Sequence, residues 1–147
     1  MNWLLLSLLL TGAPANSELV TDSPIVWVTD YEEAFVKAKR EGKHVLINFT
    51  GSDWCGWCKR LDREVFSQPT FQKYANEKLV LLKLDYPRRT PQPKEVKLRN
   101  QQLARDFAVR GFPTILLVKA NQQVILRTGY KYGGADNYVR HLDVAIK

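Results

Sequence analysis

The chain has 147 residues, a formal net charge of +7 and two cysteines. That length is about one domain's worth, and two cysteines within one motif leave no further disulfide to stabilise the fold, so the core must hold it unaided. Lysines and arginines are scattered, with the densest groups at residues 37–43 and 88–89, which is typical of a solvated surface and argues against a compact nucleic-acid site.

The start of the chain has the pattern of a secretory signal. An apolar run from Trp3 to Leu10, broken by one serine, precedes Ala13-Pro14-Ala15, a small-x-small cleavage pattern. The run is too short to span a bilayer, so we expect a signal peptide over residues 1–15, although no charged side chain precedes it. A disordered or membrane-tethered apolar tail is the alternative. Cleavage would leave an N-terminal extension, residues 16–29, and one exported domain over residues 30–147.

Two elements are expected ahead of the cysteines. The apolar spacing from Tyr31 to Glu41 predicts a helix, with Thr29 or Asp30 as its cap and Gly42 as its end. The run from Val45 to Phe49 is short, apolar and partly β-branched, which predicts a strand covered on both faces.

The hydrophobic pattern beyond the cysteines alternates between strands and helices. It predicts, in chain order, helical turns around residues 71–75, a buried strand over 79–84, a loop over 86–93, a helix over 94–107, a strand over 115–118, a tight turn at 121–122, an antiparallel strand over 124–126 and a last helix capped by Asp136. The chain therefore belongs to the α/β class.

The organising feature is Cys55-Gly56-Trp57-Cys58. The strand ahead of it, and the helical spacing of Cys58, Leu61 and Val65, place Cys55 where a turn opens a helix. Unpaired N–H groups and a partial positive charge at a helix N-terminus favour the thiolate, which is the species that attacks disulfides. We interpret the pair as a redox dithiol in which Cys55 is the nucleophile and Cys58 resolves the mixed disulfide.

Two other interpretations of this spacing carry less weight. A zinc site needs two further ligands, and the remaining candidates, His44 and His141, are far apart in sequence and not in a paired spacing. A structural disulfide that closes so short a loop would restrict the unfolded chain little. Neither accounts for the strand-to-helix context of the cysteines.

This order of elements, with Trp54-Cys55-Gly56-Trp57-Cys58 and Arg110-Gly111-Phe112-Pro113-Thr114, resembles the thioredoxin superfamily from about Tyr31 to Ile146. The stretch from Thr50 to Cys55 is similar to exported bacterial thioredoxin-like proteins of the DsbH kind, and to the C-terminal domain of the transmembrane reductant conductor DsbD. The resemblance implies a thioredoxin fold, with a central mixed β-sheet flanked by helices, the redox pair at a helix N-terminus, and a loop in which Pro113 is cis and lies against the pair.

The chain departs from thioredoxin in two places. Thioredoxin has a proline between its cysteines, where this chain has Gly56-Trp57. Thioredoxin also keeps a buried aspartate on the preceding strand, where this chain has Asn48 or Phe49, and neither can serve as a carboxylate base for Cys58. Two nearby carboxylates could substitute but are expected to be surface charges: Asp53 and Glu64. The proton acceptor for Cys58 is therefore open.

Aromatic residues surround the pair. Trp57 is hard to bury without covering the cysteines, so we interpret it as a partly exposed apolar surface for a partner's polypeptide, with Phe112 beside it. Pro113 has no N–H, which leaves the neighbouring backbone to meet an extended peptide. We therefore expect substrate binding at these three residues. Five others are expected to support the site: Trp54, Gly56, Lys59, Gly111 and Thr114.

These features predict a thiol–disulfide oxidoreductase acting on protein disulfides in the periplasm, with Cys55 and Cys58 as its redox-active disulfide. The resemblance favours a reductase that takes electrons from a DsbD-like membrane conductor and passes them to disulfide-containing client proteins. We expect a monomer without a metal, an organic cofactor or a nucleic-acid partner. A disulfide oxidase or isomerase, or a non-catalytic client-binding module of the same fold, is the alternative.

Overall fold

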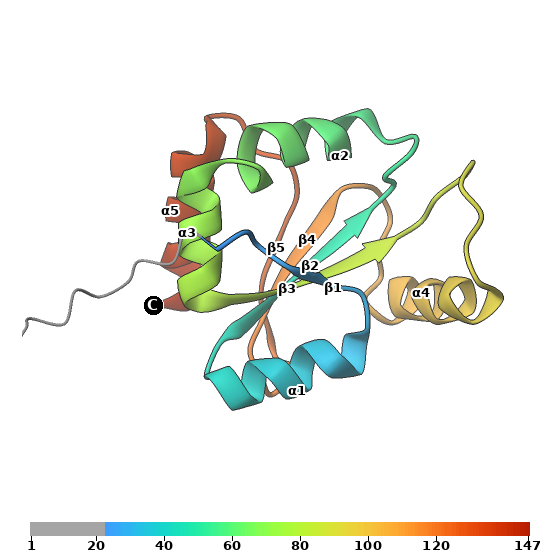
Figure 1. Ribbon diagram of the computed structural model, residues 1–147, viewed down its shortest axis with the longest axis horizontal. Coiled ribbons are helices and arrows are strands. Elements are labelled where there is room, and N and C mark those ends of the chain that lie inside the picture. Colours follow the sequence, from blue (N-terminus) through green and yellow to red (C-terminus); the bar gives the residue numbers. More distant parts are fainter. Residues whose placement is uncertain (1–22) are drawn as a thin grey trace, which may run out of the picture.

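The computed structural model describes residues 23–147, so the expected signal peptide lies outside the described residues. Five strands form one sheet in the order β1-β3-β2-β4-β5 (Figure 1). Strands β1 and β2 run parallel to β3, whereas β4 is antiparallel to both β2 and β5. Their bounds are β1 Trp27–Val28, β2 His44–Thr50, β3 Leu79–Asp85, β4 Thr114–Val118 and β5 Val124–Thr128. The mixed sheet implied by the resemblance is confirmed.

Helices cover both faces of this sheet. In Figure 1, α1 and α4 lie along the lower side of the sheet, and α2 lies along the upper side. A π-helical turn, η1, continues α2 directly and leads towards α3, which packs with α5. The bounds are α1 Tyr31–Glu41, α2 Gly56–Leu61, η1 Asp62–Phe66, α3 Pro69–Lys78, α4 Lys94–Asp106 and α5 Gly134–Ile146.

The central strand β2 is buried on both faces, as its largely apolar sequence predicts. Successive side chains of a strand point to opposite faces. Val45, Ile47 and Phe49 therefore face α1, where they pack with residues such as Phe35. Leu46 faces the other layer, formed by the helix of the redox motif, α3 and α5, whose fully buried members include Leu61, Val65, Phe71, Tyr138 and Leu142.

The ends of α1 follow the sequence signals. The Asp30 carboxylate accepts a hydrogen bond from the Glu33 N–H at 2.9 Å, so Asp30 is the cap that satisfies one of the free donors of the first turn. Gly42 ends the helix in the left-handed region, at φ +65°, which glycine adopts without a steric penalty. This helix is confirmed at both ends.

Three elements differ from the sequence expectations. Trp27–Val28 forms β1, which pairs with β3, so the sheet extends into the segment treated above as an N-terminal extension. Helix α3 runs from Pro69 to Lys78 and is longer than the expected helical turns. The cap assigned to Asp136 is wrong, because α5 begins two residues earlier, after Gly133 at φ +105°.

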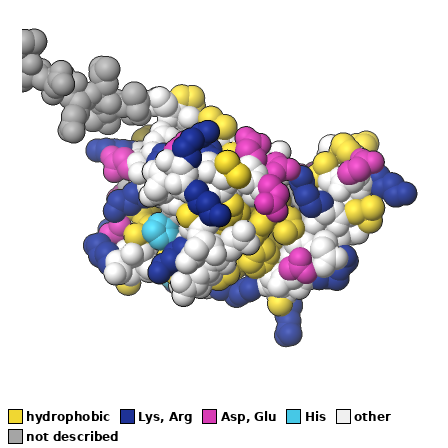
Figure 2. Space-filling view, turned by 90° about the horizontal axis from the view of Figure 1, so that it is seen from below, with side chains coloured by type: hydrophobic (Ala, Val, Ile, Leu, Met, Phe, Trp, Pro, Cys, Tyr) yellow, Lys and Arg dark blue, Asp and Glu magenta, His cyan; other side chains and the backbone are white. Residues whose placement is uncertain are grey.

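Charged side chains are dispersed on the face drawn in Figure 2. Lysines and arginines lie at separate positions there, with acidic and apolar side chains between them. None of the helices in residues 23–147 combines the length and the apolar character that a membrane span requires. The same residues contain no cluster of three or more His, Cys, Asp or Glu side chains arranged to hold a metal ion.

Candidate active site

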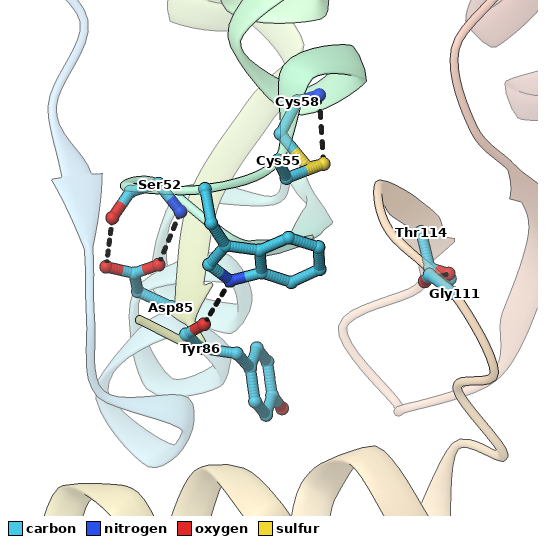
Figure 3. The surroundings of a disulfide bond; sticks show 8 residues. Ser52, Cys55, Cys58, Asp85, Tyr86, Gly111 and Thr114 are labelled. Atoms are coloured by element: carbon cyan, nitrogen blue, oxygen red, sulfur yellow. Dashed lines mark hydrogen bonds between the residues drawn. A yellow bond between two sulfur atoms is a disulfide. The ribbon is translucent and has the colours of Figure 1, made fainter. Parts of the chain in front are cut away.

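The redox pair lies where β2 ends and α2 begins. Cys55 caps α2, and its Sγ accepts a hydrogen bond from the backbone N–H of Cys58 at 3.2 Å. The two cysteines form a disulfide with their Cα atoms 5.2 Å apart (Figure 3). The placement of the pair at a helix N-terminus is therefore confirmed. Both cysteines are 5% exposed, so this oxidised form does not distinguish them, and preferential access to Cys55 stays a prediction.

Trp54 is fixed beside the disulfide by contacts on several sides. Its indole N–H donates to the carbonyl oxygen of Tyr86 at 2.8 Å (Figure 3). The guanidinium carbon of Arg88 lies 3.6 Å from the ring centroid, which is a close cation–π contact. Gly51 permits this placement, because a Cβ there would lie 2.4 Å from an indole carbon. The ring therefore depends on a glycine that the sequence analysis did not single out.

Two carboxylates join the redox turn to the loop that follows β3. Asp85, the last residue of β3, accepts hydrogen bonds from the N–H and the hydroxyl of Ser52 at 3.0 and 2.5 Å (Figure 3). Asp53 accepts the backbone N–H groups of residues 88, 89 and 90 at 3.0, 2.8 and 2.7 Å. These hydrogen bonds hold the pKa of Asp53 well below its usual range. Asp53 is thus an ionised anchor for the loop and is not free to take a proton from Cys58.

An aromatic cluster surrounds Trp57, which is 48% exposed. Its ring centroid lies 5.1 Å from that of Tyr130 and 6.4 Å from that of Tyr132. The Arg60 guanidinium lies 5.2–5.4 Å from all three ring centroids and forms a 2.6 Å salt bridge with Glu64. We call these five residues the Trp57 cluster. The two tyrosines come from the segment after β5, where no motif or periodicity in the sequence indicates them.

The Glu64 carboxylate is bound within the Trp57 cluster. Its carboxylate accepts hydrogen bonds from the Tyr130 hydroxyl and from the Arg60 guanidinium. These two hydrogen bonds lower the pKa of Glu64, the one from Tyr130 having the larger effect. Glu64 is therefore more than the surface charge that the sequence led us to expect, because its carboxylate orients Arg60 against the three aromatic rings. Like Asp53, it is engaged away from Cys58.

Phe112 belongs to a second aromatic group. The peptide bond between Phe112 and Pro113 is cis, as the resemblance implied. The Phe112 ring is half-buried, with its centroid 5.7 Å from Trp54 and 5.1 Å from Tyr86. Phe112 therefore packs with these rings and not with Trp57, which corrects the expectation that the two aromatics are neighbours.

The remaining predicted residues lie around the pair with varied contacts. The Thr114 hydroxyl donates to the Gly111 carbonyl at 2.7 Å and closes the turn that carries Pro113 (Figure 3). Lys59 is exposed on the motif helix. A Cβ at Gly56 or at Gly111 would meet no atom within 4 Å. Steric crowding therefore does not require glycine at either position.

The strand position of the thioredoxin aspartate is occupied by Asn48. Asn48 lines a small pocket together with Cys58, whereas Phe49 packs in the opposite layer, against α1. The choice left open by the sequence is thereby resolved. Across the sheet, Asn48 is in register with Lys83 on β3, and Lys83 lines the same pocket.

A family model for thioredoxin-like proteins matches residues 26–120. The chain therefore belongs to the thioredoxin-like family, and its fold and redox pair define it as a thiol:disulfide oxidoreductase. The chain is similar to the disulfide bond reductase DsbH of Chlamydia pneumoniae, with 32% identity over 117 residues that cover 80% of this chain and 70% of that protein.

Two further matches agree with this assignment. A solved structure of a DsbH oxidoreductase superposes with a TM-score of 0.81 and 28% identity, covering 92% of this chain and 94% of that chain. The thiol:disulfide interchange protein DsbD of Klebsiella pneumoniae is 32% identical over 114 residues. That match covers 76% of this chain and 17% of DsbD.

Proposed function

We propose that the protein is an exported disulfide reductase that acts on protein disulfides in the periplasm. The observation that carries this proposal is the redox pair at the start of α2, where the Cys55 sulfur faces the N–H of Cys58 at 3.2 Å. A thiolate at Cys55 would keep this hydrogen bond and the partial positive charge of the helix end, which make it the nucleophile.

The direction of electron flow depends on how strongly the reduced form of the pair is stabilised. A strong oxidant has a heavily stabilised reduced form and a potential of about −120 mV, against about −270 mV for thioredoxin. Within residues 23–147, the Cys55 sulfur accepts one hydrogen bond. The nearby guanidinium groups are engaged elsewhere, Arg60 with Glu64 and Arg88 on the Trp54 ring. The single hydrogen bond to the Cys55 sulfur and the similarity to DsbH support a reductase.

The reaction proceeds in two exchange steps. The Cys55 thiolate attacks a client disulfide, forms a mixed disulfide and displaces one client sulfur as a thiolate. Cys58 then loses its proton and attacks the Cys55 sulfur, which releases the second client thiolate and leaves the disulfide seen here. The two client thiolates take up the two protons that the dithiol gives up, so the client gains two electrons and two protons.

Client polypeptides would dock across the two aromatic groups beside the disulfide. Trp57 offers an exposed ring held by Tyr130 and Tyr132. On the turn before β4, Phe112 is half-buried and Pro113 lacks an N–H, which leaves the adjoining backbone to pair with an extended segment. We propose these three predicted residues, Trp57, Phe112 and Pro113, as the substrate-binding surface.

The equilibrium reduction potential of the Cys55–Cys58 pair against glutathione tests the direction. We expect a value more negative than about −200 mV, towards the thioredoxin end of the range. A value between about −120 and −180 mV would instead indicate an oxidase or an isomerase.

Trapping experiments test whether the protein is an enzyme or a binding module. Cys58→Ser should accumulate client adducts, because the resolving thiol is missing, whereas Cys55→Ser should form few. Equal non-covalent capture by both variants, without reduction of insulin by the wild type, would favour a binding module.

We also propose that residues 1–15 are a signal peptide, followed by an extension that begins at residue 16 and leads into the thioredoxin-like domain, whose sheet already includes β1. The protein would act as a monomer recharged by a DsbD-like membrane conductor, as the DsbD similarity supports. N-terminal sequencing of protein from a periplasmic fraction should find a start near Asn16. An intact Met1 on protein confined to the cytoplasm would contradict export.

A further inference from the structure

A pocket of about 60 Å³ adjoins the resolving cysteine, Cys58. This volume is sufficient for at least one water molecule, provided that polar atoms line the space. Charged groups line it from three elements: Lys59 of α2, Asp62 of η1 and Lys83 of β3. The buried amide of Asn48 also borders the pocket. The pocket therefore connects the resolving thiol with polar groups that the mechanism above does not use.

Asn48, which lines this pocket, has a buried side-chain oxygen without a hydrogen-bond partner among the described residues. The residue is 5% exposed, and its side-chain oxygen accepts no hydrogen bond from any of residues 23–147. A buried carbonyl oxygen without a donor is costly, and such oxygens are usually met by a buried water. A water in the pocket would donate one hydrogen to this oxygen, which leaves it a second hydrogen and its lone pairs for other partners.

Asp62 lines the same pocket as Cys58. It stands four residues after Cys58, and its backbone N–H donates to the Cys58 carbonyl, so the two side chains lie on one side of the helix. The residue is exposed, and within the described part of the chain its carboxylate takes no hydrogen bond and no salt bridge. By contrast, Asp53 and Glu64 are held by their own donors.

We propose that a water in this pocket, held by the Asn48 side-chain oxygen, passes the Cys58 proton to the Asp62 carboxylate during resolution. This inference rests on the proposed dithiol mechanism. The Cys58 S–H gives its proton to the water, which passes a proton to Asp62. The Cys58 thiolate attacks the Cys55 sulfur, and the bond between Cys55 and the client sulfur breaks. The client thiolate leaves with the electron pair and takes up a proton from Asp62 or from solvent.

The positive charge of Lys83, which lines the pocket, favours deprotonation of Cys58. Its ammonium group lies 5.8 Å from the centroid of Trp27, and its strand position is in register with Asn48. A cation at the pocket favours the Cys58 thiolate while the proton is on Asp62. Lys59, one residue after Cys58, is exposed and contributes a more screened charge.

The test is a single-turnover experiment on the full-length mature protein. Reduced protein is mixed with oxidised glutathione and quenched with acid, and the Cys55–glutathione adduct is followed by mass spectrometry. In Asp62→Asn we expect adduct formation at the wild-type rate and resolution slowed at least tenfold at about pH 7, with the difference disappearing in strong base. Asp62→Glu should retain rapid resolution, and Asp136→Asn, which makes the same charge change in the first turn of α5, should match the wild type.

Whether Asp62→Asn slows or accelerates resolution shows whether Asp62 acts as a proton acceptor or only through its negative charge. If Asp62 acted only through its negative charge, its removal would favour the Cys58 thiolate and accelerate resolution at neutral pH. Faster resolution, an unchanged rate, or equal slowing at every pH would each overturn the proposal.

Asn48→Leu tests the water itself. An apolar side chain of similar size fills the pocket and removes the unpaired oxygen, so the folded state should be at least as stable in urea while resolution slows as in Asp62→Asn. Wild-type resolution in this variant would overturn the role of the water. The glutathione adduct resolves whichever way electrons flow in the cell, so an oxidising potential would refute the reductase proposal and leave this test intact.

Discussion

Gly51→Ala tests whether Trp54 is locked beside the redox pair. The added Cβ would lie 2.4, 2.5 and 2.7 Å from three atoms of the indole, whereas non-bonded heavy atoms prefer about 3.5–4.0 Å. The ring must therefore shift by about 1 Å or the turn must open. Either movement disturbs the hydrogen bond to the Tyr86 carbonyl and the stacked Arg88.

The expected cost follows from these contacts. Overpacking a close contact costs about 1–3 kcal/mol, a net hydrogen bond is worth about 1 kcal/mol, and an exposed cation–π contact about 0.5–1 kcal/mol. Because a displaced ring relieves part of the clash, we expect the free energy of unfolding of Gly51→Ala to fall by about 2–3 kcal/mol. With a urea m-value of about 2 kcal/mol/M, the midpoint should fall by about 1–1.5 M.

Gly56→Ala provides a matched control. A Cβ at Gly56 meets no atom within 4 Å, and Gly56 is the first residue of α2. Alanine should leave the free energy of unfolding unchanged or raise it by at most about 1 kcal/mol, because it restricts the unfolded chain. Equal midpoints for the two oxidised variants would refute the claim that the indole is held against Gly51.

Four other outcomes can be measured directly. In the reduced protein, iodoacetamide should label Cys55 before Cys58, and the reverse order would exchange their roles. Asp53→Asn should be less stable at neutral pH, because the loop loses its anionic anchor. The depressed pKa of Asp53 means that the wild type keeps this stabilisation above about pH 4 and loses it as the pH falls through the lower folded value, so urea midpoints of the two proteins should converge in acid. Phe112→Ala should slow reduction of folded protein disulfides more than reduction of oxidised glutathione, which needs little docking surface, and equal losses would argue against docking. Tyr132→Ala removes a ring that is 68% exposed, so it should change stability by about 0.5 kcal/mol or less and still slow client turnover; unchanged turnover would remove Tyr132 from the docking surface.

The parts of the fold that could be predicted from sequence are those with local signals. Asp30 and Gly42 mark the ends of α1 because capping and a left-handed end depend on residue type at one position. The apolar run of β2 and the cysteine spacing likewise place the redox pair at the start of α2. These signals need no knowledge of distant residues.

The parts that escaped prediction depend on contacts across the fold. Strand β1 has two residues and exists only because it pairs with β3, so no periodicity could reveal it. Tyr130 and Tyr132 lie in an irregular segment and gain their role from Trp57, which is distant in sequence. From sequence, Asn48 was one of two candidates for the position of the thioredoxin aspartate, and its pocket with Asp62 appears only when the strand meets the motif helix.

The edges of the sheet bear on how the protein meets unfolded chains. One edge is β1, whose two residues offer few free backbone groups. The other edge is β5, where the pairing with β4 is irregular and Arg127 is bound to the Phe107 carbonyl. Short or irregular edges are poor templates for another strand to join. An unfolded polypeptide that meets this protein thus finds little opportunity to extend its sheet by adding a strand at either edge.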